Sequence, residues 1–411
     1  MNDATLTDTL SMPVAPIEFE PIPAESPEVA PISEPVPVPA PPPHSIRRRL
    51  RRLGSAIASA SEWMFGALAI FVGLALLSTL PLLQLLSFGY LLESAGRVAR
   101  SGRFRNAFIG VRLAARLGSM AIGCWLMLLP LGLLASLARS AEIIDPHGPV
   151  ARRWRIGLIV LTVLIVGHML AACARGGKLR YFFWPFGTPG WFLRQWRRGR
   201  LFVTARDAVW DFVTALRLPY YFRIGALGFV GTACWLIIPV SLIAAGRRFP
   251  PVGFVGGLML AIVSLALPFL QIRFAAEDRF RAFLEYRAIR ERFRRAPWAF
   301  AVAAFMTLTF AVPLYLLKIE MIPREVAWLP SLIFLAFSLP ARTLTAWAYS
   351  RSERREAMRH WFFRWTGRLI MLPVGLIYAV IVFLTQYTAW RGIWSLYEQH
   401  AFLLPVPFLN M

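Results

Sequence analysis

Long apolar runs alternate with polar, arginine-rich segments between residues 63 and 389. A helix needs about 20 apolar residues to cross the hydrocarbon core of a bilayer, and no run is shorter than 18 residues. The sequence therefore predicts an all-α fold, a polytopic transmembrane helix bundle of about 7–8 spans. The runs cover residues 63–92, 119–138, 157–174, 224–245, 252–272, 298–317, 328–348 and 369–389.

The first run, 63–92, is too long for one simple span. As a helix it would measure about 45 Å, against about 30 Å of hydrocarbon. Pro81 also removes a backbone hydrogen-bond donor from its second half. The run is either one bent span or two short limbs that form a re-entrant hairpin. We take the hairpin as the prediction, because it keeps the arginine cluster at 47–52 on the same side as the basic loops that follow.

Basic residues between the runs indicate an orientation. Segments 92–118, 175–223, 273–297 and 349–368 are rich in arginine, whereas the segments that alternate with them are poor in it. Arginine-rich loops of membrane proteins face the cytoplasm. We therefore predict that these four loops are cytoplasmic, that the C-terminus is extracytoplasmic and that the N-terminus is cytoplasmic.

Three short patterns recur in the same order in two parts of the chain. The pairs are Leu80–Leu85 with Leu267–Ile272, Pro130–Leu134 with Pro313–Leu317, and Arg180–Trp184 with Arg359–Phe363. They predict two parallel repeats of about four segments, divided into membrane halves 53–245 and 246–391. The alternative is that unrelated membrane helices end in similar ways. A strict repeat would make the first run cross once and would place the N-terminus outside.

The two ends of the chain differ from the membrane part. Residues 1–52 are rich in proline and acidic residues until they end in an arginine cluster, and we predict a disordered tail with polyproline II character. The cluster should contact anionic lipid headgroups. Its members are Arg47, Arg48, Arg49, Arg51 and Arg52. Residues 392–411 form an apolar C-terminal tail that is too short to span, and its last part should lie at the membrane interface.

Composition excludes several classes of protein. The net charge of +23 does not indicate nucleic-acid binding, because the arginines lie between apolar runs, and 57% of the residues are hydrophobic. We expect membrane lipids as partners and no nucleic acid. The three cysteines and five histidines lack metal-binding spacing, and nucleotide-binding motifs are absent, so neither a metal nor another cofactor is predicted.

Few polar residues lie inside the apolar runs, and no run has a central Asp or Glu. This pattern disfavours proton-coupled pumps and intramembrane proteases. The candidate intramembrane polar contacts are Gln84, Gln271 and His168. The two glutamines occupy the same position in the repeat and could hydrogen-bond to each other, or else contact a substrate. Arg342 is expected to reach the headgroups from near a helix end.

Two basic segments are predicted to form amphipathic helices on the cytoplasmic surface. In 274–295, Phe280, Phe283 and Leu284 lie on one side of a single helix and Phe293 lies off that stripe. In 181–223, aromatic residues alternate with arginines, as is typical of interfacial anchoring. Upstream, Glu93 precedes Arg97 by four residues, the spacing of a helical ion pair.

Three segments resemble parts of uncharacterised polytopic membrane proteins of bacteria. They are Phe88–Arg103, Arg206–Phe212 and Pro297–Phe300, and the resemblance covers residues 60–390. It implies a bacterial inner membrane, but no activity and no site residue.

The sequence contains no recognisable catalytic machinery, so we do not expect an enzyme. We predict a membrane-embedded interaction or assembly protein. The alternative is a secondary transporter or channel-like protein with a midplane site near Gln84, Gln271 or His168, and an enzyme that acts on lipids is a third hypothesis. A water-accessible midplane cavity would favour transport, whereas a closed bundle would favour interaction.

Overall fold

The computed structural model describes seven stretches of the chain. They are residues 46–80, 82–184, 187–199, 201–316, 328–389, 391–398 and 400. Every secondary-structure element within this described part is helical, which confirms the all-α prediction. The proline-rich tail up to residue 45, Pro81 and the last eleven residues, 401–411, lie outside it. The chain divides into two compact units, Met1–Ser55 and Ala56–Met411, and the second contains nearly all the described elements.

Eight of the described helices are long and apolar enough to cross a membrane. Seven of the eight predicted runs each correspond to one of these helices and the first run begins in another, so the chain is a multi-pass membrane protein. The helices are α1 (Ile46–Ser78), α3 (Val111–Ile144), α4 (Pro149–Ala174), α8 (Leu218–Ala245), α9 (Pro250–Glu277), α11 (Pro297–Leu316), α12 (Trp328–Glu353) and α13 (Trp361–Thr388).

The first apolar run forms two helices rather than one bent helix. The long α1 ends at Ser78, and α2 (Gln84–Ser101) begins six residues later. Leu82, between them, has a left-handed backbone with φ of 66°. We predicted a hairpin of two short limbs, but α1 alone has 33 residues and contains a candidate span. The related pattern around Pro268 lies inside the continuous helix α9, so the two copies have different local structures.

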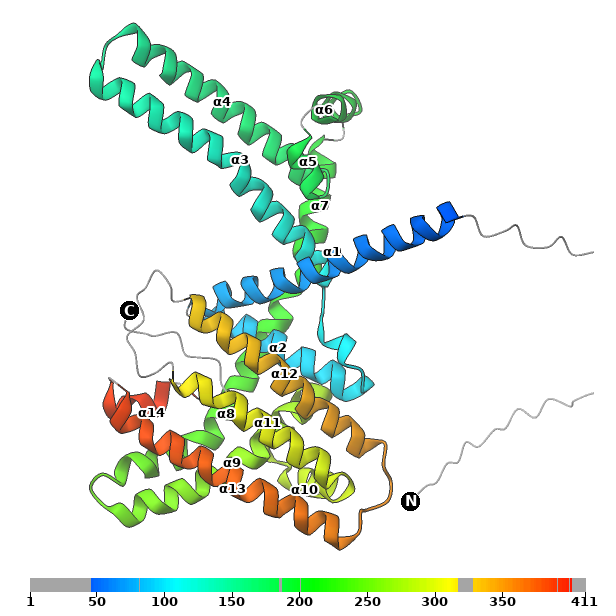
Figure 1. The fold of residues 1–411 in the computed structure, drawn as a ribbon, viewed down its shortest axis with the longest axis vertical. Helices are drawn as coiled ribbons and strands as arrows, with labels where there is room; N and C mark the ends of the chain where they lie inside the picture. The colour runs from blue at the N-terminus through cyan, green and yellow to red at the C-terminus, as the bar shows by residue number, and fades with distance from the viewer. Residues whose placement is uncertain are drawn as a thin grey trace, which may run out of the picture. The chain divides into compact units, whose positions relative to one another are not determined.

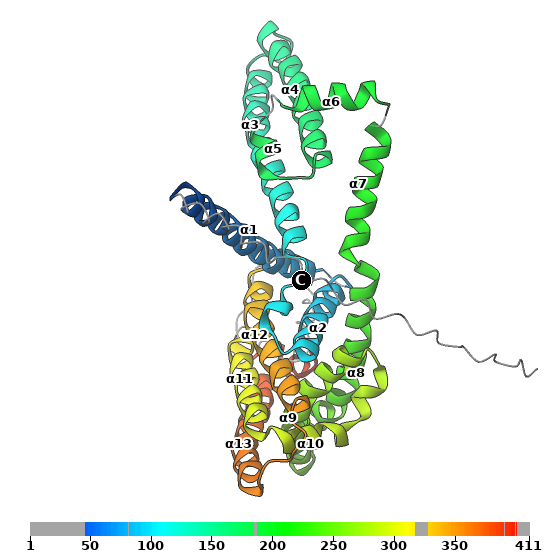
Figure 2. The ribbon, with the colours of Figure 1, turned by 90° about the vertical axis from the view of Figure 1, so that its right-hand side faces the viewer.

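Helix α2 lies within the bundle, packed against α8, α9 and α12 (Figures 1 and 2). Glycines allow this close packing. A Cβ added at Gly89 would lie 1.8 Å from the Tyr221 carbonyl oxygen of α8, and one added at Gly96 would lie 2.5 Å from the Ala275 oxygen of α9. The backbones of these helices are therefore in direct contact, as in other tightly packed membrane helices.

A local structural repeat follows α2 and α9. Each helix ends at a residue with a left-handed backbone, Gly102 (φ 67°) or Asp278 (φ 50°). An Arg-Phe-Arg sequence comes next in both places, and a short 3₁₀ helix forms there: η1 (Phe104–Ala107) or η2 (Phe280–Leu284). This correspondence differs from the three patterns named above. The duplication of the two membrane halves stays a prediction.

The single amphipathic helix predicted for 274–295 is wrong. Helix α9 runs to Glu277, and η2 and α10 (Tyr286–Arg295) follow. The left-handed turn at Asp278 changes which side chains face the bundle, since it interrupts the helical period. Phe283 and Phe293 are buried, whereas Leu284 is 73% exposed and Phe280 is 40% exposed.

The aromatic segment that we expected at the membrane surface forms several helices before α8. These are α5 (Leu179–Phe183), α6 (Gly187–Arg197) and α7 (Leu201–Leu216). Phe182 is buried and lies directly over Gly123 of α3, whereas Trp184 and Trp210 are exposed. The exposed tryptophans are compatible with interfacial anchoring, which stays a prediction.

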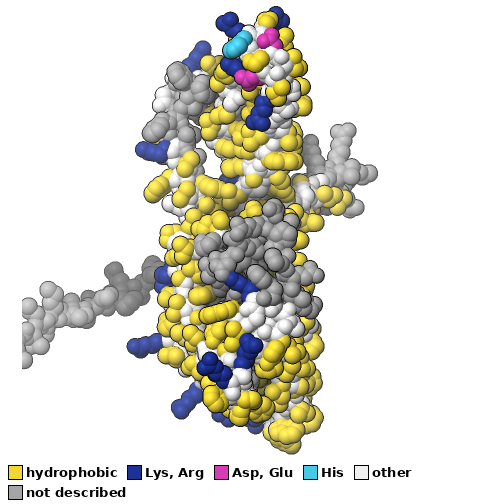
Figure 3. Space-filling view, turned by 90° about the vertical axis from the view of Figure 1, so that its left-hand side faces the viewer, with side chains coloured by type: hydrophobic (Ala, Val, Ile, Leu, Met, Phe, Trp, Pro, Cys, Tyr) yellow, Lys and Arg dark blue, Asp and Glu magenta, His cyan; other side chains and the backbone are white. Residues whose placement is uncertain are grey.

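Helices α3 and α4 form an antiparallel hairpin with little covering from the rest of the described chain (Figure 3). Only 6% of the apolar window of α3 and 17% of that of α4 is buried, against 56% in α9 and 61% in α12. Figure 3 shows hydrophobic side chains over most of this hairpin, with charged side chains gathered where the two helices join. The α3–α4 hairpin therefore presents a largely apolar surface to its surroundings.

Candidate functional site

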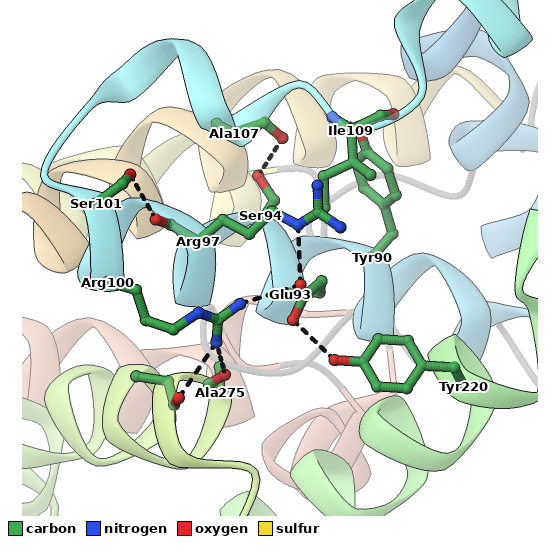
Figure 4. Close-up of polar contacts among 11 residues, drawn as sticks. Tyr90, Glu93, Ser94, Arg97, Arg100, Ser101, Ala107, Ile109, Tyr220 and Ala275 are labelled. Atoms are coloured by element: carbon green, nitrogen blue, oxygen red, sulfur yellow. Dashed lines mark hydrogen bonds and ion pairs between the residues drawn. The ribbon is translucent and has the colours of Figure 1, made fainter.

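A buried carboxylate on α2 forms the centre of one polar cluster (Figure 4). Glu93 is 3% exposed. Its Oε1 accepts hydrogen bonds from Arg97 Nε at 2.9 Å and from Arg100 Nη2 at 3.1 Å, and its Oε2 accepts one from the Tyr220 hydroxyl at 2.9 Å. The Glu93–Arg97 pair confirms the expected helical spacing. Both carboxylate oxygens are engaged, as a buried charge requires.

Arg100 extends this cluster from α2 to α9. Its Nη1 donates to the Ala275 oxygen at 3.0 Å and to the Ala276 oxygen at 3.2 Å. Carbonyls in the last turn of a helix have no partner within the helix, so the arginine satisfies two acceptors at the end of α9. Since Tyr220 belongs to α8, Glu93 and Arg100 together connect α2, α8 and α9 (Figure 4).

Two further contacts in Figure 4 attach the connection after α2 to the helix itself. Ser94 Oγ donates to the Ala107 oxygen at 2.7 Å. The Tyr90 hydroxyl donates to the Ile109 oxygen at 3.1 Å and accepts from the Ile109 amide at 3.0 Å. The polar side chains of α2 therefore satisfy backbone groups and charges of neighbouring segments, and the cluster is a structural connection between helices.

A second buried polar cluster surrounds Gln271 on α9. Its Nε2 donates to Thr232 Oγ1 of α8 at 2.7 Å, and its Oε1 accepts from Arg342 Nη1 of α12 at 3.0 Å. The Arg342 guanidinium also lies 4.9 Å from the centre of the Phe88 ring. Arg342 is only 6% exposed, so the expectation that it reaches the headgroups is wrong. Contacts with polar partners inside the bundle offset the free-energy cost of burying the Arg342 charge.

The other glutamine occupies a different environment. Gln84 is the first residue of α2, and its Oε1 has no hydrogen-bond partner in the described part of the chain. The expected bond between Gln84 and Gln271 is not among the described contacts. Their equivalent positions in the sequence pattern do not place them in equivalent structures, because one pattern lies between two helices and the other lies inside α9.

The cavity beside Gln271 is small. It has a volume of about 20 Å³ and is lined by residues of α9, α11 and α12, among them Thr307, Ser338 and Arg342. That volume suffices for one water molecule. The cavity is therefore too small for an organic substrate.

His168 lies in the α3–α4 hairpin and belongs to neither buried cluster. Its Nε2 is 2.9 Å from the Phe182 oxygen, so it connects α4 to α5. This contact is compatible with a packing role for His168, which stays a prediction.

The arginine cluster before the first span is described only in part. The backbone of α1 begins at Ile46, but the side chains of 46–51 lie outside the described residues, and Arg52 is exposed. Their contact with lipid headgroups stays a prediction.

The basic segments meet at one end of the helix bundle. Arg292 Nη2 donates to Glu353 Oε1 at 3.0 Å, which connects 273–297 to 349–368. Arg354 Nη2 donates to the Ser101 oxygen at 2.6 Å. An ion pair of Arg223 with Asp278 joins residues 217–223 to the same group. These contacts are compatible with a common side of the membrane for the four segments, which stays a prediction.

The helix ends without arginine clusters meet elsewhere. The Tyr315 and Tyr378 hydroxyls are 2.7 Å apart, and Tyr397, in the short helix α14 (Ser395–Glu398), donates to Ser241 Oγ at 3.2 Å. His400, the last described residue, is buried against the same group, with Nδ1 3.5 Å from the Tyr315 hydroxyl. The described start of the C-terminal tail therefore packs on the bundle.

Comparisons with protein-family models, with curated proteins and with solved structures found no match. Within the described residues, no three His, Cys, Asp or Glu side chains gather as they would around a metal ion. The two polar clusters consist of groups bonded to each other, and the sequence pattern did not predict that Glu93 and Arg342 are buried. A signal for Glu93 was present, because arginines follow it at the helical spacings of four and seven residues.

Proposed function

We propose that this multi-pass membrane protein is an interaction or assembly protein, in which the α3–α4 hairpin packs against transmembrane helices of another chain. The observation that carries the proposal is the contrast in burial between this hairpin, at 6% and 17%, and helices α9 and α12, at 56% and 61%. The chain therefore combines a bundle of well-buried helices with two membrane helices that have few partners in the described part of the chain.

A face of small residues on α3 supports this proposal. Gly132, Ser136 and Ser140 are exposed and spaced four residues apart, so they lie on one side of the helix. A Cβ added at Gly132 would meet no atom within 4 Å. Small residues at this spacing allow the backbones of two membrane helices to approach closely, and van der Waals packing then drives their association.

The alternative of a transporter with a midplane site gains no support from the geometry. Gln271 is bonded to Thr232 and Arg342 beside a cavity of about 20 Å³, and His168 contacts Phe182 in the hairpin. We assign the protein to a bacterial inner membrane, with its basic end in the cytoplasm, as part of the same proposal. This assignment rests on the resemblance of Phe88–Arg103 and on the distribution of arginines.

Site-specific photo-cross-linking in native membranes tests the proposal. A photoreactive phenylalanine analogue at Leu133 or Leu137, which flank the small-residue face, should give a discrete protein adduct. Gly132→Leu should reduce that adduct to background, because a large side chain separates the two backbones. Gly157→Leu on α4 is the matched control, since Gly157 is also exposed with no atom within 4 Å of an added Cβ, and it should leave the adduct unchanged.

Adducts with lipid alone in the unsubstituted chain would refute the assembly proposal, as would equal losses in Gly132→Leu and Gly157→Leu. Labelling of a cysteine that replaces Ser338 tests the transporter alternative, because Ser338 lines the cavity near Gln271. In a chain whose native cysteines are replaced by serine, ready labelling of that cysteine by an impermeant maleimide would favour the transporter.

A further inference from the structure

A cavity with a basic wall and an aromatic wall lies at the basic end of the bundle. It has a volume of about 400 Å³ and forms where three helices meet: the start of α11, the end of α12 and the start of α13. The loop between α12 and α13 contributes two of its arginines. The residues that define it here are Trp298, Val302, Arg351, Arg355, Arg359 and Phe363.

No carboxylate in the described part of the chain pairs with these three arginines. Among the described residues, none of them forms an ion pair, and the nearby Glu353 is bonded to Arg292 instead. Desolvation and the charges of Arg359 and Arg351 lower the pKa of Arg355 below its usual value. A cluster of like charges is destabilising by itself, and a bound anion would relieve it.

Aromatic rings hold two of these guanidinium groups in place. The Arg351 guanidinium lies 5.2 Å from the centre of the Trp347 ring, and that of Arg359 lies 6.0 Å from the centre of the Phe363 ring. The Arg359 amide also donates to the Arg294 oxygen at 3.0 Å, which fixes the backbone of the loop. Planar guanidinium groups held in this way suit the geometry of phosphate oxygens.

The first turn of α11 adds to the positive potential. Ala296, Pro297 and Trp298 line the cavity, and α11 begins at Pro297 with no acidic residue in its first turn. Amide groups at a helix N-terminus lack partners within the helix and carry a partial positive charge. The dipole of α11 therefore adds to the positive potential of the three arginines.

The opposite side of the cavity is apolar and continues along a membrane helix. Trp298 and Val302 line it and are each 47% exposed. Phe305 and Val312 follow on the same side of α11 and are 45% and 37% exposed. Because α11 is one of the candidate spans, this stripe leads from the cavity toward the hydrocarbon of the bilayer.

We propose that this cavity is a binding site for an anionic phospholipid. Arg351, Arg355 and Arg359 hold the phosphate, and an acyl chain lies along Trp298 and Val302. The apolar stripe selects a lipid over free phosphate, which would use only the basic wall. It also selects a lipid over an acidic peptide, which would leave the exposed stripe on α11 uncovered.

Photoreactive lipids test the site in the full-length chain. The protein is reconstituted in phosphatidylcholine nanodiscs that contain a small fraction of either phosphatidylglycerol or phosphatidylcholine with a diazirine near the start of one acyl chain. Trypsin releases the peptide 296–318, which includes Trp298 and Val302. We expect phosphatidylglycerol to label this peptide in clear preference to phosphatidylcholine.

Substitution of the arginines should remove that preference. Arg355→Gln should reduce it about fivefold, and the triple variant Arg351→Gln, Arg355→Gln, Arg359→Gln should abolish it. The matched control replaces Arg194, Arg197 and Arg198 by glutamine, which removes the same charge from another basic segment and should leave the preference unchanged. If the triple variant fails to fold, as judged by gel filtration and circular dichroism, the single variant carries the test.

Three results would overturn the proposal. The first is equal labelling by the two lipids in the unsubstituted chain. The second is an equal loss of preference in the control triple variant, which would show a general charge effect. The third is loss of labelling in inorganic phosphate but not in sodium chloride of the same ionic strength, which would show a site for free phosphate.

Discussion

Single charged residues hold the interior of this bundle together, because each has partners from several helices. Glu93 on α2 contacts two arginines of its own helix and Tyr220 of α8, and Arg342 on α12 contacts Gln271 of α9. A buried charge without partners would cost several kcal/mol, on the order of 3–5 kcal/mol when one member of a pair is removed. These residues therefore specify which helices pack together.

Glu93→Gln should lower the free energy of unfolding by about 2 kcal/mol. The amide keeps one acceptor but loses the charge that pairs with Arg97 and Arg100. Because both arginines are partly exposed, the lost stability should be smaller than for a fully buried ion pair. Unfolding by sodium dodecyl sulfate in mixed micelles measures the effect. Glu291→Gln is the control, because the exposed pair of Glu291 with Arg295 should contribute less than about 0.5 kcal/mol. Equal effects of the two substitutions would contradict the structural role of Glu93.

At the scale of elements, α2 is the helix on which the bundle depends. It is not one of the eight apolar helices, since it carries Glu93, Arg97 and Arg100, and yet most of its residues are buried. Gly89 faces the α8 backbone, and Gly225 of α8 faces α2 in return, with an added Cβ 1.9 Å from the Leu85 oxygen. Tight backbone contact brings the polar side chains of α2 within reach of their partners.

Gly89→Ala should destabilise the protein by about 2–3 kcal/mol, because the new methyl group would force α2 and α8 apart. The same detergent titration measures the loss. Gly257→Ala in α9 is the matched control, since no atom lies within 4 Å of an added Cβ there, and a helical Gly→Ala change should be neutral or stabilising by up to about 1 kcal/mol. A neutral Gly89→Ala variant would show that the two helices can separate without cost.

At the scale of the whole molecule, contacts near the helix ends fall into two groups in the described part of the chain. Basic segments contact one another through pairs such as Arg292 with Glu353, and the other ends are joined to the C-terminal segment through Tyr397 with Ser241 and His400 with Tyr315. Each group gathers ends that alternate along the chain. This arrangement is what a multi-pass protein with uniform orientation requires.

Cysteine labelling in intact cells and in permeabilised cells tests this division. In a chain without native cysteines, cysteines at Arg103, Arg287 and Glu356 should react with an impermeant maleimide only after permeabilisation. Cysteines at His147 and Arg247 should react in intact cells. Labelling of Arg103→Cys and Glu356→Cys from opposite sides would contradict the common end. A reporter fused at residue 45 tests the predicted cytoplasmic N-terminus in the same cells.

Seven of the eight apolar runs predicted from the sequence correspond to single helices long enough to cross a membrane, because hydrophobic length is a local property of the chain. The first run is divided between α1 and α2. The prediction of a single helix at 274–295 failed, since a left-handed turn at Asp278 is favourable only with the packing that surrounds it. The candidate site was predicted in part. Gln271 is a buried polar contact, but its partners Thr232 and Arg342 come from other helices.

The sequence by itself determined the membrane class and the number of long apolar helices. These features follow from the free energy of transfer of individual segments, which depends on their own residues. The tertiary structure decided that the charged helix α2 is buried, that Arg342 lies inside the bundle and that three arginines surround a cavity beside Trp298. Those features depend on partners that are distant along the chain, since a polar group enters an apolar interior only where another part of the fold satisfies it.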